Sequence, residues 1–191
     1  MKNHRTLPAA GLILAATLCA CLPMQAIAQS KPSAVTTDTQ PAFTVLGYWV
    51  RTSGQKEAGG SGLIPQLWQR VMEEGLLDNV PHRADTNFTA VYTDYSSDQN
   101  GEYTYVLGDR VTSVDKVPDG MMAVTVPAGK YAVIASDTGS LPDVLPKLWQ
   151  RIFAMSPAQL GGERAFKADY EIFPEGFDWQ NAQIAAHLGL K

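Results

Sequence analysis

The tetrapeptide Leu-Trp-Gln-Arg occurs twice in the chain, at residues 67–70 and again 81 residues later at 148–151. Trp is rare here, since two of only four Trp residues belong to these copies. The longer frames, LIPQLWQRVM and VLPKLWQRIF, space their apolar residues three and four apart, which is typical of one face of an α-helix. A long repeat that occurs only twice predicts a duplicated module with pseudo-twofold symmetry.

Strand-like runs surround the two helices in the same order. In the first half, residues 43–50 precede a helix that should begin just before Pro65 and end at Gly75. Residues 88–95 and 102–111 then form a hairpin around Asn100-Gly101, a pair that tolerates positive φ. In the second half, residues 123–136 predict strand, turn and strand, a helix follows with Pro146 in the place of Pro65, and residues 168–173 and 182–190 predict two more strands.

These patterns predict an α+β fold made of a duplicated β-α-β-β module. Each helix should lay its apolar face on an antiparallel sheet. The boundary between the halves falls near residues 117–120, Val-Pro-Asp-Gly. The domain should span residues 42–191.

The N-terminus has the layout of a secretory signal peptide. A short basic start is followed by an uncharged, mostly apolar run, and Ala26-Ile27-Ala28 offers a cleavage site before Gln29. The run is too short for a permanent membrane span. The alternative is a lipoprotein with Cys21 as the lipidated residue. Residues 29–41 are polar and small, with Pro near both ends, and predict a flexible linker.

Cleavage after Ala28 would remove Cys19 and Cys21, the only cysteines, and leave about 160 residues, enough for one packed domain. It would also remove Lys2 and Arg5, leaving 13 basic against 19 acidic residues and a net charge of −6. This balance argues against a nucleic-acid partner and favours small cationic ligands. No cofactor or metal pattern is present, and we expect a periplasmic or secreted monomer whose partner is a small molecule.

Alternation along the strands assigns their faces. Tyr103, Tyr105 and Leu107 share one face, and Phe88, Ala90 and Tyr92 share one face of the neighbouring strand. Both faces of these strands are partly apolar. We therefore expect one face to pack against the helices and the other either to line a groove or to be core. The simplest interpretation of Trp68 and Trp149 is helix–sheet core, and contact with a ligand is the alternative.

Glu171 is a carboxylate within a strongly apolar strand, between Tyr170, Ile172 and Phe173. Period two places Asp169, Glu171 and Phe173 on one face. Spacing alone favours a solvated Glu on an exposed sheet face.

Four segments in this order resemble the GyrI-like effector-binding family: IPQLWQRV (64–71), TDYSSDQNGEYTYVLG (93–108), VPAGKYAV (126–133) and DYEIF (169–173). The resemblance covers residue 43 to the C-terminus. It implies a duplicated module whose antiparallel sheet curves around two helices, with a ligand cleft near the pseudo-twofold axis. Family ligands are often amphipathic, aromatic and cationic. Regulators of this family carry a DNA-binding helix-turn-helix before the domain, where this chain has a leader and a linker.

The resemblance also assigns the site. It implies that Glu171 lies at the cleft and faces the cationic part of the ligand, with Asp169 as the fallback. The ligand-binding residues expected around it are Tyr92, Tyr103, Tyr105, Trp68, Trp149 and Phe173. Some GyrI-like proteins instead hydrolyse strained small molecules in the same cleft, and Glu171 would then act as a general base. The sequence shows no nucleophile–base pair, so we expect a binding protein.

The first prediction concerns export. The basic start, the apolar run and the small residues of the cleavage site predict a mature N-terminus at Gln29. Intact-mass measurement of the native protein checks this. A chain that retains Met1, or one that carries acyl groups on Cys21, would contradict simple cleavage.

Overall fold

The computed structural model describes residues 34–59 and 62–191. The predicted signal peptide, its cleavage site and Cys21 lie outside the described residues. The strands are β1 (Thr36–Gln40), β2 (Phe43–Ser53), β3 (Arg83–Thr93), β4 (Glu102–Val111), β5 (Met121–Val126), β6 (Gly129–Ala135), β7 (Arg164–Phe173) and β8 (Ala185–Leu190). The helices are α1 (Gly54–Ala58), α2 (Leu63–Glu74), α3 (Leu141–Phe153) and α4 (Pro157–Leu160). None of these helices is long and apolar enough to cross a bilayer.

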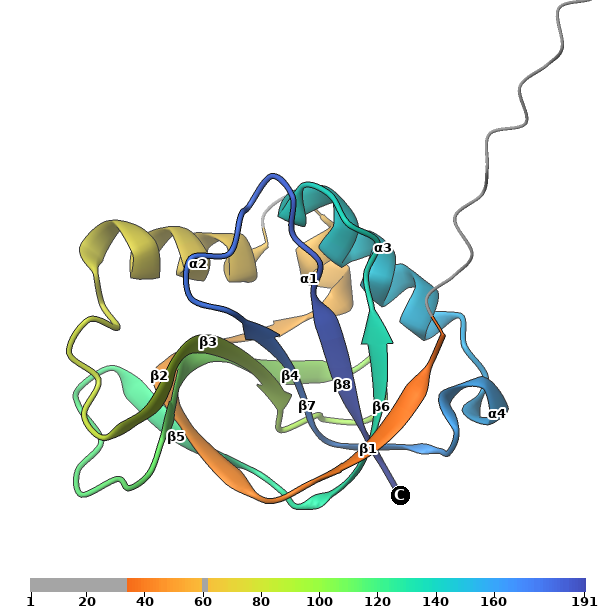
Figure 1. Ribbon diagram of the computed structural model, residues 1–191, viewed down its shortest axis with the longest axis horizontal. Helices are drawn as coiled ribbons and strands as arrows, with labels where there is room; N and C mark the ends of the chain where they lie inside the picture. Colours follow the sequence, from red (N-terminus) through yellow and green to blue (C-terminus); the bar gives the residue numbers. More distant parts are fainter. Residues whose placement is uncertain (1–33, 60–61) are drawn as a thin grey trace, which may run out of the picture. The chain divides into compact units, whose positions relative to one another are not determined.

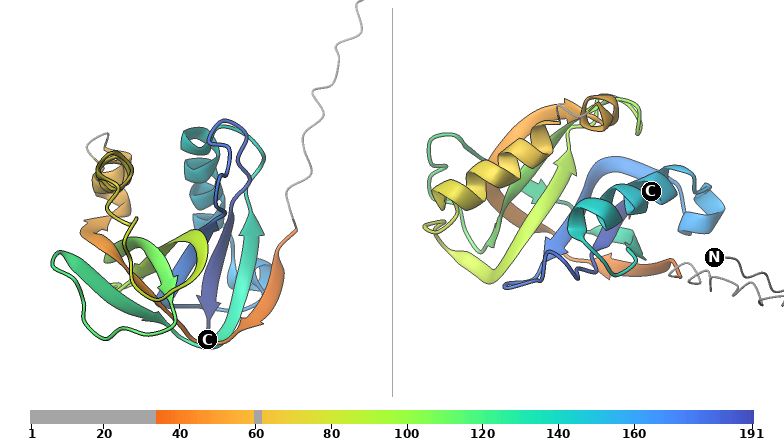
Figure 2. Two further views of the ribbon diagram at one scale, coloured as in Figure 1. Left: turned by 60° about the vertical axis from the view of Figure 1, so that its left-hand side comes forward. Right: turned by 90° about the horizontal axis from the view of Figure 1, so that it is seen from above.

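The strands form one antiparallel sheet in the order β1-β6-β8-β7-β3-β4-β2-β5. This order is palindromic about the central pair: β2-α2-β3-β4 on one side corresponds to β6-α3-β7-β8 on the other. The predicted duplication is therefore confirmed. Both long helices lie on the same side of the sheet, one over each half (Figures 1 and 2).

The pseudo-twofold axis passes through the β3–β7 pair. Ala90 pairs directly with Glu171 across these strands. The two residues are 81 positions apart, as are Trp68 and Trp149. Equivalent positions of the two halves thus meet at the centre of the sheet, and Glu171 is the residue that the second half places there.

Proline and glycine residues mark the start and the end of α2, but the prolines of α3 are placed differently. Pro65 is the third residue of α2, where a missing N–H costs little, and Gly75 ends the helix in the left-handed region at φ 60°. The expectation that Pro146 takes the place of Pro65 in the first turn of its helix is wrong. The helix α3 begins at Leu141, and Pro146 lies inside it. Pro142 and Pro146 are both exposed. Water can therefore bond the carbonyl that loses its helical donor.

The predicted linker is wrong for residues 36–40, which form the edge strand β1 against β6. Its side chains are mostly exposed, so no apolar alternation marks it in the sequence. The strand is held by backbone pairing, and its three Thr residues favour extended structure. It covers the outer edge of β6, as β5 covers the outer edge of β2.

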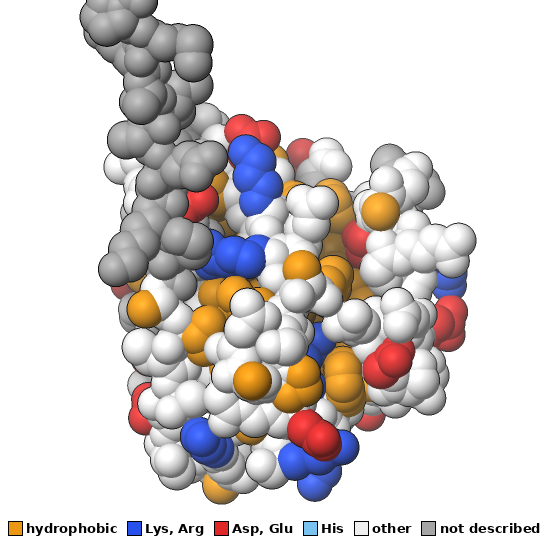
Figure 3. Space-filling model, turned by 90° about the vertical axis from the view of Figure 1, so that its right-hand side faces the viewer, with side chains coloured by type: hydrophobic (Ala, Val, Ile, Leu, Met, Phe, Trp, Pro, Cys, Tyr) orange, Lys and Arg blue, Asp and Glu red, His pale blue; other side chains and the backbone are white. Residues whose placement is uncertain are grey.

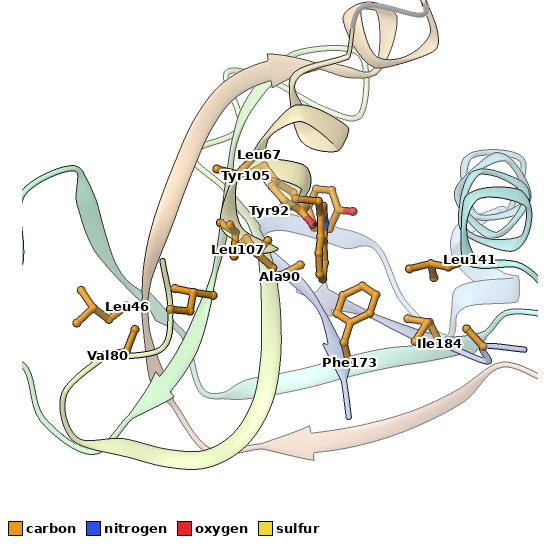
Figure 4. Packing of buried hydrophobic residues seen from close by; sticks show 14 of the residues in the cluster. Leu46, Leu67, Val80, Ala90, Tyr92, Tyr105, Leu107, Leu141, Phe173 and Ile184 are labelled. Carbon is orange, nitrogen blue, oxygen red and sulfur yellow. Dashed lines mark hydrogen bonds between the residues drawn. The ribbon is translucent and has the colours of Figure 1, made fainter. Parts of the chain in front are cut away.

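The sheet is buried on both faces. On the helix side, the cluster around Leu67, Tyr105 and Phe173 reaches from α2 across the centre of the sheet to Leu141 of α3, as Figure 4 shows. The opposite face carries a second cluster that includes Val91, Val106 and Tyr170. Of the two expectations for the second face, the groove is wrong and core is confirmed. The helix-side face packs against the helices and also lines the cavity between them.

Each of the two repeated Trp residues contacts the other copy of the module. Trp68 of α2 packs edge-on against Phe173 of β7, with ring centroids 4.9 Å apart. Trp149 of α3 packs against Tyr92 of β3 at 4.7 Å. Since 81 residues also separate Tyr92 from Phe173, these two contacts are equivalent under the pseudo-twofold axis. Each helix thus packs on a strand that belongs to the other copy of the module.

The second prediction concerns Trp68, which is 9% exposed and donates a hydrogen bond from Nε1 to the Tyr105 hydroxyl at 2.8 Å. Trp68→Ala should lower the free energy of unfolding by about 3–5 kcal/mol, because it opens a cavity and removes this bond. The matched control is Trp49→Ala, at a side chain 44% exposed, which should change stability by about 0.5 kcal/mol or less. Urea unfolding checks both. Equal effects of the two changes would contradict the core role of Trp68.

Candidate functional site

A cavity of about 810 Å³ lies between α2 and α3, above the centre of the sheet. This volume is typical of small-molecule sites. Its wall is mainly apolar and aromatic, and Figure 3 shows hydrophobic side chains within a hollow of the molecule's surface. The aromatic and large apolar residues that line it are Ile64, Trp68, Met72, Tyr92, Tyr95, Tyr103, Leu141, Leu145, Trp149, Phe153 and Trp179.

The aromatic rings of the wall form a connected series. The Tyr92 ring lies 5.5 Å from Tyr103 and 4.7 Å from Trp149, between centroids. The Tyr103 ring lies 5.8 Å from Tyr95. The faces and edges of such rings give a flat aromatic ligand several places to stack, and attract cations.

Four of the seven predicted site residues line the cavity: Trp68, Trp149, Tyr92 and Tyr103. Tyr105, Phe173 and Glu171 do not line it and are 0% exposed. They form a layer behind the wall. For Tyr105 and Phe173 this means core packing, and a direct ligand contact of either residue remains a prediction that the geometry does not favour.

Sequence reasoning missed Tyr95, Arg164 and Trp179. Tyr95 follows β3 after Asp94, which adopts the left-handed conformation at φ 50°. Trp179 lies in the segment between β7 and β8, and its ring packs 5.5 Å from Trp68. Tyr95 and Trp179 carry no periodic signal, because they reach the cavity from chain segments outside the strands. Arg164 is the first residue of β7, and an irregular pairing separates it from the regular part of that strand. Only the tertiary fold brings them to the site.

Glu171 is the central electrostatic feature. Its carboxylate accepts a hydrogen bond from Trp149 Nε1 at 2.6 Å and from the Tyr92 hydroxyl at 3.2 and 3.3 Å. Among the described residues, no Lys, Arg or His side chain forms an ion pair with it. The expectation from spacing alone, a solvated Glu, is therefore wrong, since the central position on the helix side is covered by aromatic rings.

Burial raises the pKa of Glu171 from 4.5 to about 7. The hydrogen bonds from Trp149 and Tyr92 stabilise the charged form and lower the pKa in part, whereas the negative charge of Asp169 raises it further. Glu171 is thus a carboxylate that titrates near neutral pH, directly behind two aromatic residues of the cavity wall.

Asp169, the fallback for Glu171, has a different environment. It is fully buried, but it accepts hydrogen bonds from Arg164 Nη2 at 2.5 Å, from the Tyr95 hydroxyl at 2.6 Å and from the Gly189 backbone N–H at 2.9 Å. Its charge is therefore compensated inside the protein. Glu171 and Asp169 share a strand face, and only Glu171 has a charge that a ligand could compensate.

The arrangement offers contacts that suit a flat or bulky aromatic cation. The rings offer dispersion and cation–π contacts, which contribute about 0.5–2 kcal/mol each. The buried carboxylate adds an uncompensated negative charge in a region of low dielectric constant. No group of three or more potential metal ligands occurs in residues 34–59 and 62–191.

The chain matches a protein family and several known proteins in sequence. Residues 38–185 match the Cass2 family, described as integron-associated effector binding protein. The chain is 26% identical over 143 residues to YobU of Bacillus subtilis, a match that covers 74% of this chain and 88% of YobU. It is 30% identical over 138 residues to the transcriptional regulator BrlR of Pseudomonas aeruginosa, covering 72% of this chain and 47% of BrlR.

Two solved structures share the fold. The integron cassette protein of Vibrio cholerae superposes with a TM-score of 0.65 at 22% identity, covering 83% of this chain and 96% of that protein. SAV2435, solved with bound tetraphenylphosphonium, superposes with a TM-score of 0.66 at 13% identity, covering 82% of this chain and 93% of SAV2435. The fold expected from the resemblance is confirmed. The chain belongs to the Cass2 family of integron-associated effector-binding proteins, within the GyrI-like effector-binding family that its sequence resembles.

Proposed function

We propose that this protein binds amphipathic aromatic cations in the cavity between α2 and α3. The observation that carries the proposal is Glu171, a fully buried carboxylate with no cationic partner among the described residues, behind an aromatic wall. An isolated buried charge is costly unless it is paired. A ligand cation held against Tyr92 and Trp149 would provide the missing partner.

Two further findings support the proposal. SAV2435 shares the fold and was solved with tetraphenylphosphonium, a lipophilic aromatic cation. The acidic balance of the chain favours cationic over anionic ligands. We also propose export through the N-terminal leader, so that the cavity would capture its ligand outside the cytoplasm without contacting nucleic acid.

Hydrolysis of a reactive ligand in the same cavity is the second candidate. The raised pKa of Glu171 favours it, because a general base works best when its pKa lies near the working pH. The geometry opposes it, because the carboxylate does not line the cavity and its oxygens accept bonds from Trp149 and Tyr92. Mass spectrometry of ligands recovered after incubation separates the two functions.

The third prediction concerns Glu171→Gln. Because one unit charge about 7 Å away contributes about 1–2 kcal/mol at an effective dielectric constant of about 20–40, affinity for tetraphenylphosphonium should fall about tenfold or more. A neutral aromatic ligand should lose less than about twofold. Titration calorimetry with one cationic and one neutral ligand measures both.

The matched control is Glu73→Gln. Glu73 also lines the cavity, but its side chain is exposed and bonds to Gln69. Removal of an exposed charge should reduce cation affinity by about twofold at most, and added salt should abolish that loss. Equal losses for cationic and neutral ligands in Glu171→Gln would refute the electrostatic role.

The fourth prediction concerns pH. In the free protein the raised pKa keeps Glu171 largely protonated below pH 7. A bound cation favours the charged form, so binding releases a proton. Affinity for the cation should therefore increase as pH rises towards about 7 and level off above it. The Glu171→Gln variant should lack this dependence, and a wild-type affinity that is flat between about pH 5 and 8 would contradict the assignment.

A further inference from the structure

Arg164 at the start of β7 is a buried guanidinium with unused donors. It lines the cavity, and its side chain is only 6% exposed. Its Nη2 donates to Asp169. Nε and Nη1 have no hydrogen-bond partner among the described residues, and protein atoms cover both of them. A buried donor left unpaired costs about 1–3 kcal/mol, more in a charged group, so a guanidinium in this state calls for an explanation.

The fold holds Arg164 in this place. The pairing of β7 with β8 is irregular between Arg164 and Asp169, and Phe166 in between adopts φ 51°. This bulge lays the guanidinium over the Phe166 ring, with Cζ 4.4 Å from the ring centroid. Tyr95 packs on the same ring at 5.6 Å and lines the cavity. Arg164 therefore lies at the Tyr95 end of the aromatic series, away from Trp149.

The charges around this end limit what Arg164 can bind. Asp169 compensates the guanidinium charge, so the pair offers directional N–H donors with little net charge. Glu57 and Glu73 also line the cavity, and Glu171 lies behind it. Glu57 accepts bonds from the first N–H groups of α2, which hold its carboxyl group at the wall. A ligand with net negative charge would be repelled, whereas an oxygen acceptor on a cationic ligand would not.

We propose that Arg164 forms a second subsite in this cavity, in which its guanidinium turns on ligand binding and an unpaired N–H donates to an acceptor oxygen carried by a cationic aromatic ligand. This inference rests on the proposed function and adds a specificity that Glu171 does not provide. Asp169 and Glu171 are two residues apart on one strand face, about 7 Å. Because Arg164 is bonded to Asp169, the ligand should carry its acceptor roughly 7 Å from its cationic centre, on a side arm of the cation. Carbonyl, ether, hydroxyl and carboxylate oxygens share this chemistry.

Three matched ligands test the subsite: a triphenylphosphonium with a plain alkyl chain, one whose chain of similar length ends in a methyl ester, and one whose chain ends in a free carboxylate. All carry the same cation, and only the last two carry an acceptor. Because a hydrogen bond to a charged group contributes about 1.5–3 kcal/mol, wild-type protein should bind the ester about tenfold more tightly than the alkyl ligand. The carboxylate arm shows whether a charged acceptor is preferred over a neutral one.

Arg164→Lys is the informative variant, because an ammonium can keep the ion pair with Asp169 but lacks the additional planar donors. The ratio of ester to alkyl affinity should fall to about one. Should this variant unfold, the double variant Arg164→Met/Asp169→Asn removes both charges together and should give the same ratio. Arg70→Lys is the control, at an exposed Arg that does not line the cavity, and should keep the wild-type ratio.

The outcomes separate this inference from the proposed function. Wild-type protein that binds the alkyl and ester ligands equally has no acceptor subsite. An Arg164→Lys variant that keeps the wild-type ratio of ester to alkyl affinity would also overturn it, because Arg164 would then be structural. Failure of all three ligands to bind wild-type protein would overturn both the subsite and the proposed function.

Discussion

The antiparallel pairing of β3 with β7 is the constraint on which the rest of the structure depends. It joins the two copies of the module, and the pseudo-twofold axis runs through the Ala90–Glu171 pair. The helices follow from it, because Trp68 and Trp149 each pack on an aromatic residue of the opposite half. The space between the helices, above this pair, becomes the cavity.

The two halves share a scaffold but differ in chemistry at equivalent positions. The first half has Ala90 where the second has Glu171. The indole N–H of Trp68 donates to a tyrosine hydroxyl, whereas that of Trp149 donates to the buried carboxylate. Asp169, whose equivalent in the first half is Phe88, adds to this asymmetry by accepting bonds from Arg164 and Tyr95. The duplicated fold thus provides the packing, and a few side chains without an equivalent in the other half make the surroundings of the cavity electrostatically asymmetric.

Much of this fold could be predicted from the sequence, because the repeat and the alternation of side chains are local signals. The faces assigned to Tyr92, Tyr103 and Glu171 by period two agree with the structure. The burial of Glu171 could not be predicted by spacing alone, since it depends on Trp149 arriving from a distant helix. Strand β1 was missed because an edge strand of exposed polar residues has no apolar pattern. Arg164 was missed because a bulge interrupts the alternation that would have placed it.

The central claim is that Glu171 is a buried, unpaired acid that a bound cation ionises. Carbon-13 NMR of the Glu171 side-chain carboxyl, titrated with pH in the free protein and with tetraphenylphosphonium bound, measures this directly. The account predicts a pKa of about 7 in the free protein and a clearly lower pKa in the complex. An ordinary carboxyl pKa in the free protein, or a raised pKa that does not change when the cation binds, would contradict it.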